Sequence, residues 1–229
     1  TDDLSLLLNG MHVDRDTTCC GADSTQSASV NAELAAQGLA QDKSDPYDYD
    51  TAVNVDSKFK LQSDLVSLVV DYDQDWGNIT SITAWNDYDY QSSTDADRSQ
   101  LDILSIVDDK YSGDSLSQEL RFAASAGELM DYQVGLFYYD QTTKRGDGSP
   151  FVILGEDFIT IASQQDLPLP APVSFLAAPG DFLTGKAKLE TETFAIFSQA
   201  TWHINERWHV RAGLRWSDEE KKADLLSVT

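Results

Sequence analysis

The acidic residues with the most suggestive spacing are Asp71, Asp73 and Asp75, which alternate ahead of Gly77. A calcium-binding loop supplies oxygen ligands from its first, third and fifth positions, has glycine at the sixth and ends in a glutamate at the twelfth. Here the glycine stands one position late, and the twelfth position is Ile82. Because two defining positions fail, we interpret this segment as a polar turn between two strands.

Two further groups of possible metal ligands are also incomplete. His203 and His209 flank a polar turn and would face each other across a hairpin, but no third ligand stands at zinc-site spacing. Cys19 and Cys20 are adjacent, which leaves open a strained disulfide, two thiols or intermolecular links. We expect a structural histidine pair, a loop feature without function at the cysteines, and neither a metal nor a cofactor.

Composition and motifs argue against an enzyme and against a nucleic-acid binder. The 229 residues include 39 acidic and 16 basic ones, for a net charge of −23, whereas phosphate binding requires a basic surface. The sequence contains no G-x-S-x-G elbow, no Walker loop and no dinucleotide fingerprint. Carboxylates suited to glycoside hydrolysis are numerous, but nothing gathers two of them in a cleft. We expect a protein that binds its ligand without chemical conversion.

The elements that would position these residues are clearest in the hairpin 193–218. Every second residue of its second strand is apolar: Trp208, Val210, Ala212, Leu214 and Trp216. If 205–207 forms the turn, the apolar residues of the two strands meet in pairs, Ile204 with Trp208, Trp202 with Val210 and Ala200 with Ala212. Tryptophans at both ends of such a strand are typical of the aromatic girdles of a transmembrane β-strand. The pattern therefore predicts one lipid-facing side and one polar side.

Short polar turns alternate with long connections along the chain. Strand-like segments at 4–13, 65–72, 79–90, 116–123 and 132–140 precede the hairpin, and the long connections are 14–62, 91–113 and 141–186. Antiparallel strands with short turns at one end and long loops at the other are typical of outer-membrane barrels. We predict an all-β, antiparallel, up-and-down transmembrane barrel fragment of about seven strands, with long extracellular loops.

Three segments of the long loops are candidates for ligand contacts, because loops carry function more often than framework does. The acidic stretches 42–56 and 95–109 are either simply solvated, bridged by divalent cations to lipopolysaccharide phosphates, or suited to a cationic ligand. The proline-rich stretch 167–182 could cover the barrel mouth as a lid.

Four segments resemble TonB-dependent outer-membrane receptors, in the order of that family. They are NITSITAWNDYDYQSSTDAD (78–97), SLSQELRFAA (115–124), YQVGLFYYDQ (132–141) and TETFAIFSQATWHINERWHVRAGLRWSDEEKK (191–222). The resemblance implies a 22-stranded barrel with a plug domain in its lumen. It also implies uptake of a scarce, bulky ligand, such as a ferric siderophore, a cobalamin or a glycan fragment, in the bacterial outer membrane.

We interpret residues 1–229 as part of such a barrel, without the plug domain and the closing strands. The expected partners are an extracellular ligand, the bilayer with its lipopolysaccharide, and the TonB energy-transducing complex acting through the plug domain. Glu119, Arg121, Arg211 and Arg215 are expected to face the lumen, where they would pair with the plug or contact the ligand. The alternatives are a soluble or secreted all-β module that binds a ligand or glycan, and a passive porin-like channel.

Overall fold

The described residues of the structure, a computed structural model, form one antiparallel sheet of eight strands and two short helices, α1 (Ala28–Gln37) and α2 (Phe158–Gln164). It describes residues 3–19, 26–39, 52–147, 149–164 and 178–228. The strands are β1 (Leu4–Thr18), β2 (Lys58–Gln74), β3 (Gly77–Asp95), β4 (Leu104–Ala126), β5 (Met130–Arg145), β6 (Pro150–Leu154), β7 (Phe182–Asn205) and β8 (Trp208–Val228). The predicted antiparallel up-and-down order is confirmed.

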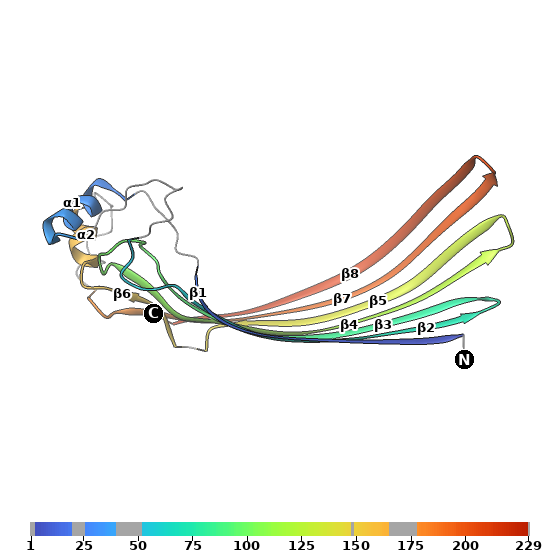
Figure 1. Ribbon diagram of the computed structural model, residues 1–229, viewed down its shortest axis with the longest axis horizontal. Coiled ribbons are helices and arrows are strands. Elements are labelled where there is room, and N and C mark those ends of the chain that lie inside the picture. Colours follow the sequence, from blue (N-terminus) through green and yellow to red (C-terminus); the bar gives the residue numbers. More distant parts are fainter. Residues whose placement is uncertain (1–2, 20–25, 40–51, 148, 165–177, 229) are drawn as a thin grey trace.

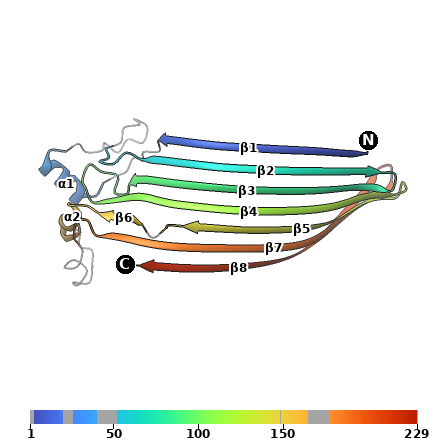
Figure 2. The same cartoon turned by 90° about the horizontal axis from the view of Figure 1, so that it is seen from below.

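The strands form a wide, curved wall rather than a layered core. Each long strand pairs with its neighbour along the chain, and the wall bends toward one side (Figure 1). The strand β6 lies beyond the end of β5, between β4 and β7, so it continues the path of β5 after a short interruption (Figure 2). A curved, twisted wall of this kind is what one sector of a large barrel requires.

One face of the wall carries a belt of exposed apolar side chains at the end with the short turns. Directly paired residues of neighbouring antiparallel strands lie on the same face, so the register defines rings across the sheet. One such ring is Leu6, Val70, Ser81, Leu120, Leu136, Ile196 and Trp216. Ile196 lies in the interior of the sheet and is still 48% exposed, so no protein core covers this face.

The belt has a polar interruption at the boundary of β3 and β4. Gln118 donates a hydrogen bond to Ser81 Oγ at 2.9 Å and accepts one from Thr83 Oγ1 at 2.5 Å. Because the three side chains satisfy one another, their polar groups can face an apolar solvent at reduced cost.

The strands are longer than the segments predicted from apolar alternation, because each strand extends past its last apolar residue. Beyond the belt, the same alternation continues with charged residues at the end that carries the long connections. Among the described helices, neither is long and apolar enough to cross a membrane.

The predicted hairpin register is confirmed, apart from its last pair. Trp202 pairs with Val210, and Ala200 pairs with Ala212, as expected. At the turn, however, Trp208 pairs with Asn205 instead of Ile204, after a register shift between His203 and Asn205. Asn205 Oδ1 accepts hydrogen bonds from the backbone N–H of Arg207 and Trp208 at 3.0 and 2.9 Å, which tightens the turn by one residue.

Parts of three long connections pack into a small cap at the other end of the wall. Val30 and Leu34 of α1, Leu101 of the β3–β4 connection and Ile161 of α2 form its buried core. Ser27 caps α1 by accepting a hydrogen bond from the backbone of Val30, as expected for an N-cap serine. Figure 1 shows both helices together at the end that lies farthest from the short turns.

Candidate functional site

The concave face of the wall carries arginines among polar, aromatic and aliphatic residues, and it forms the candidate site. A ring on this face, one residue out of phase with the apolar belt, runs through Asp71, Thr80, Arg121, Gly135, Phe197 and Arg215. Arg121 and Arg215 therefore lie in one ring, although 94 residues separate them in the sequence (215 minus 121). Both were expected to face inward, and the register is consistent with this.

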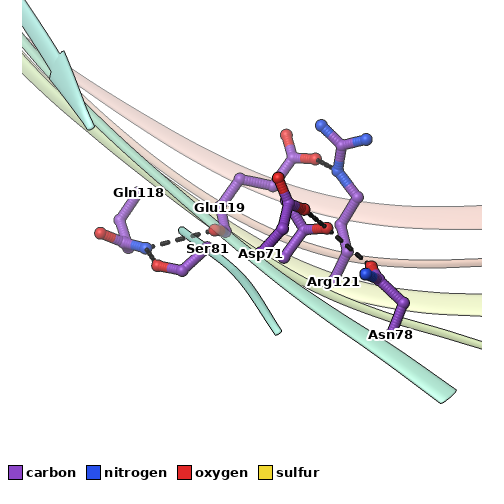
Figure 3. Close-up of polar contacts among 7 residues, drawn as sticks. Asp71, Asn78, Ser81, Gln118, Glu119 and Arg121 are labelled. Atoms are coloured by element: carbon purple, nitrogen blue, oxygen red, sulfur yellow. Dashed lines mark hydrogen bonds and ion pairs between the residues drawn. The ribbon is translucent and has the colours of Figure 1, made fainter. Parts of the chain in front are cut away.

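Glu119 and Arg121 form an ion pair with each other along β4, through Arg121 Nε and Glu119 Oε1. In Figure 3 this pair lies on the opposite side of the sheet from Ser81 and Gln118. Beside it, Thr80 Oγ1 bonds to Asp71 at 2.6 Å and to Asn78 at 2.9 Å. Arg121 thus already has a carboxylate partner within this chain.

Arg215 has a different environment, because aromatic rings surround its guanidinium. The Cζ atom lies 5.5 Å from the ring centre of Phe137 and 5.9 Å from that of Phe197. Its Nε donates to Ser217 Oγ at 3.0 Å, and within the described residues no carboxylate forms an ion pair with it. Phe137 in turn stacks on Tyr139, with 6.4 Å between the ring centres. Stacked arginine and aromatic groups suit planar or anionic ligands.

Arg211 lies apart from this group, closer to the short turns. Its Nε donates a hydrogen bond to Thr201 Oγ1 at 3.1 Å. Thr201, on β7, lies opposite Asp131 on β5. The four lumen candidates are therefore not one cluster: Glu119, Arg121 and Arg215 occupy two adjacent rings, and Arg211 stands two rings below Arg215.

The histidine pair is part of a longer hydrogen-bonded chain that the sequence did not indicate. His203 Nδ1 lies 2.7 Å from His209 Nδ1, and His203 Nε2 lies 2.8 Å from Asp131. Asp131 also accepts from Ser125 Oγ at 2.6 Å, so the chain joins β4, β5, β7 and β8. Asp131 contacts the far nitrogen of His203, so it cannot share a metal with the two facing nitrogens.

A second arginine site, also missed by the sequence analysis, lies where β4 and β5 approach the cap. Arg145 donates to both oxygens of Asp109 at 3.1 Å each, and it stacks between Tyr111 (5.3 Å) and Phe151 (4.9 Å). Asp109 is only 8% exposed, so this fork is a structural pair. The sequence could have placed Arg145 on the inner face, because it lies an even number of residues from Phe137 and Tyr139 on β5 and therefore points to the same side.

The remaining ligand candidates show no cation geometry. Asp73 and Asp75 lie at the turn between β2 and β3, and in the described part of the chain no three histidine, cysteine or acidic side chains come together as metal ligands. Cys19 is disulfide-bonded, whereas Cys20 and most of the proposed lid and acidic loop, 165–177 and 40–51, lie outside the described residues.

A curved antiparallel wall with an apolar outer belt, an inner face that bears the arginines and long connections at one end is part of a membrane-spanning β-barrel. The family model for the β-barrel of TonB-dependent receptor-like proteins matches residues 21–227, so the chain belongs to this family of bacterial outer-membrane receptors. Members of the family are transport receptors, not enzymes. No curated protein matches the sequence at a significant level.

Solved structures with the same fold are outer-membrane receptors as well. The ferric-catecholate import receptor Fiu from E. coli K12, in its closed form, aligns with a TM-score of 0.60 and 16% identity over 97% of this chain and 33% of the receptor. The ferric yersiniabactin uptake receptor FyuA from Yersinia pestis aligns with a TM-score of 0.53 and 18% identity over 76% of this chain and 25% of the receptor. This chain therefore spans about a quarter to a third of their length.

Proposed function

We propose that this chain is one sector of a receptor that takes up a scarce, bulky ligand with energy from the TonB complex, acting through a plug domain. The observation that supports this most directly is the inner wall with its arginines and aromatic rings, which lies next to the packed cap. A closed barrel of about 22 strands, the number that the family resemblance implies, encloses a lumen far wider than an ion or a sugar needs.

Within this function, we assign the ligand class as a ferric siderophore. The two solved relatives named above are receptors for ferric siderophores by their descriptions. On this chain, Arg215 presents a cation among Phe137, Phe197 and Tyr139 on the inner wall, an arrangement that favours an anionic, aromatic ligand over a neutral glycan. Glu119, Arg121 and Arg211 would line the path by contacting either the plug or the ligand.

The experiment uses bacteria that express the receptor from its complete gene under iron limitation. Uptake is measured with ferric catecholates and ferric yersiniabactin that carry radioactive iron, and with cobalamin that carries radioactive cobalt, each with and without an uncoupler of the proton-motive force. Saturable uptake of one ferric siderophore that the uncoupler abolishes is the expected result. Uptake that continues with the uncoupler would support the passive channel, and saturable uptake of cobalamin alone would overturn the siderophore assignment.

A further inference from the structure

The inner face of the wall changes its chemistry from one half of the sheet to the other. The strands β1, β2 and β3 lie side by side along one half (Figure 2). Their inward positions are uncharged over four successive rings, which comprise every second residue, counted from the first, of 7–13 on β1, 63–69 on β2 and 82–88 on β3. We refer to these residues as the neutral sector.

The charged side chains of the inner face are concentrated on β4 and β8 instead. At the level of the neutral sector they are Glu119, Glu219 and Lys221. The ring directly below contains Arg121 and Arg215, together with Asp71 on β2, which accepts a hydrogen bond from Thr80. The basic groups at these levels therefore lie on one half of the inner wall.

The polar groups of the neutral sector have partners within the sector. Asn9 Nδ2 donates a hydrogen bond to Ser67 Oγ at 3.3 Å, and Ser63 Oγ donates one to Asn86 Oδ1 at 3.4 Å. A polar group that keeps a hydrogen-bond partner loses its water at a much lower cost than one without a partner. The neutral sector can therefore be covered by another part of the protein with no water layer in between.

Large apolar side chains of this sector also need a cover. Leu7 and Met11, both on β1, are 55% and 53% exposed, and Val69 and Leu65 continue the apolar surface across β2. A neighbouring strand of the complete barrel would cover their flanks, but not the ends that point into the lumen. Exposed apolar surface of this kind marks a contact with another part of a protein.

The other half of the inner wall cannot lose its water at a comparable cost. Within the described residues, Arg215 donates to Ser217 and Arg211 donates to Thr201, and neither arginine forms an ion pair with a carboxylate. Burying a charge without a partner is strongly unfavourable. A body that fills the lumen is therefore expected to pack against β1–β3 and to remain separated by water from β4–β8.

We propose that the plug domain packs directly against the neutral sector, and that the ligand passes along β4, β5, β7 and β8. The proposal deepens the proposed function and rests on it, because it assumes a receptor with a plug domain. This chain covers 33% of the length of Fiu, so a receptor of that size has ample chain outside these strands to fill the lumen. The plug domain stays seated on β1–β3 while the passage opens beside it.

Four inward serines provide a matched test. Ser63→Cys and Ser67→Cys each place a thiol in the neutral sector, whereas Ser115→Cys and Ser117→Cys place the same thiol on the inner face of β4. Ser67 and Ser117 even lie on one ring, joined through Ala84. The wild-type receptor is the blank, since Cys19 is disulfide-bonded.

The first measurement is the rate at which a water-soluble maleimide labels each variant of the complete receptor, purified in detergent without ligand. Rates are divided by those of the urea-unfolded variants, and heat-modifiable migration in gels checks folding. The two β2 variants should react at least about tenfold more slowly than the two β4 variants, because a thiol beneath the plug domain reacts only when the contact opens. Equal rates for Ser67→Cys and Ser117→Cys, or a faster rate on β2, would overturn the proposal.

The second measurement repeats the labelling in energised cells that are supplied with a ferric catecholate. Labelling of Ser117→Cys should rise severalfold and return to the resting rate with an uncoupler, while labelling of Ser67→Cys stays slow. An equal rise at both positions would show that the plug domain leaves the wall as a whole, against the proposal. The ligand-free comparison decides where the plug domain packs even in a receptor that imports no catecholate, so a failure of the proposed function is distinguishable.

Discussion

The aromatic ring of Phe197 lies directly over the backbone of Gly135 on the neighbouring strand, so there is no room for a side chain at that position. Phe197 in turn stacks against Arg215, which pairs with it from β8. The glycine thus allows an aromatic and a guanidinium to lie flat on the inner wall.

Replacing Gly135 with alanine should displace the Phe197 ring and loosen the Arg215 stack. Overpacking of this kind costs about 1–3 kcal/mol. We expect a lower urea midpoint for the folded receptor in micelles, followed by tryptophan fluorescence. Gly10→Ala is the control, because a Cβ there meets nothing within 4 Å and should leave the midpoint unchanged. Equal midpoints for the two variants would contradict the close packing.

Neutralising Arg215 should weaken binding of an anionic siderophore, because this arginine has aromatic neighbours and no carboxylate partner among the described residues. We expect Arg215→Gln to raise the Kd for the transported ferric siderophore by about tenfold, the effect of roughly 1–2 kcal/mol for a charged hydrogen bond or stack. Arg207→Gln, in the β7–β8 turn, is the matched control. A Kd that remains at the wild-type value would remove Arg215 from the ligand path.

Placing a charge on the belt should impair membrane insertion, whereas the same charge on the inner face should not. Leu214, on β8, is 82% exposed on the apolar face. Leu214→Arg is expected to cost about 2–4 kcal/mol near the bilayer midplane. The amount of heat-modifiable receptor in purified outer membranes reports the loss. Gln199→Arg is the control, because Gln199 lies on the inner face of β7 directly opposite Gly213. Comparable losses in both variants would contradict the assignment of faces.

Removing Leu34 should open the cap without unfolding the wall. Leu34 is 1% exposed and packs with Leu101 and Ile161, so Leu34→Ala removes a buried side chain at about 2–5 kcal/mol. Hydrogen exchange should rise together in 26–39, 95–103 and 155–164, while the strands stay protected. Leu129→Ala, at an exposed position in the β4–β5 turn, provides the same substitution without burial. Faster exchange confined to 26–39 would show that the three segments are not one unit.

The contact between β4 and the loop after β5 should persist into acid. The hydrogen bond and charge of Lys110, with added hydrogen bonds from Ser149, hold the pKa of Asp147 well below its usual range. A carboxyl with a depressed pKa stabilises its contact above its ordinary pKa and loses that contribution only as pH falls through the lowered value. The carboxyl carbon shift of Asp147 should therefore stay in its ionised position at pH 3.5. In Lys110→Met it should titrate nearer the ordinary range for aspartate, and an unchanged titration would contradict the assigned cause.

Much of the fold followed from the sequence, because strand alternation is a local property. A period of two residues assigns every side chain of a strand to one face, and matching apolar pairs fixes the register. That reasoning predicted Trp202 opposite Val210, and it also placed Arg211 and Arg215 on the polar side of β8. The family resemblance came from the same strands, and the family match over residues 21–227 confirmed it.

The local pattern failed where backbone geometry or side-chain capping decided the outcome. The turn between β7 and β8 is one residue shorter than predicted, because the Asn205 side chain accepts hydrogen bonds from two backbone N–H groups. The short strand β6 was missed, because its apolar run at Pro150–Leu154 lies within a long connection and has no alternation.

The sequence by itself determined the strands, their faces and their family, since these depend on residues a few positions apart. Only the tertiary structure decided which distant residues meet: Gly135 beneath Phe197, Leu34 against Leu101 and Ile161, and Lys144 opposite Lys188. Such meetings depend on how far each strand extends and where each long connection packs. Those quantities result from the free energy of the whole sheet and cap, and no short window of sequence encodes them.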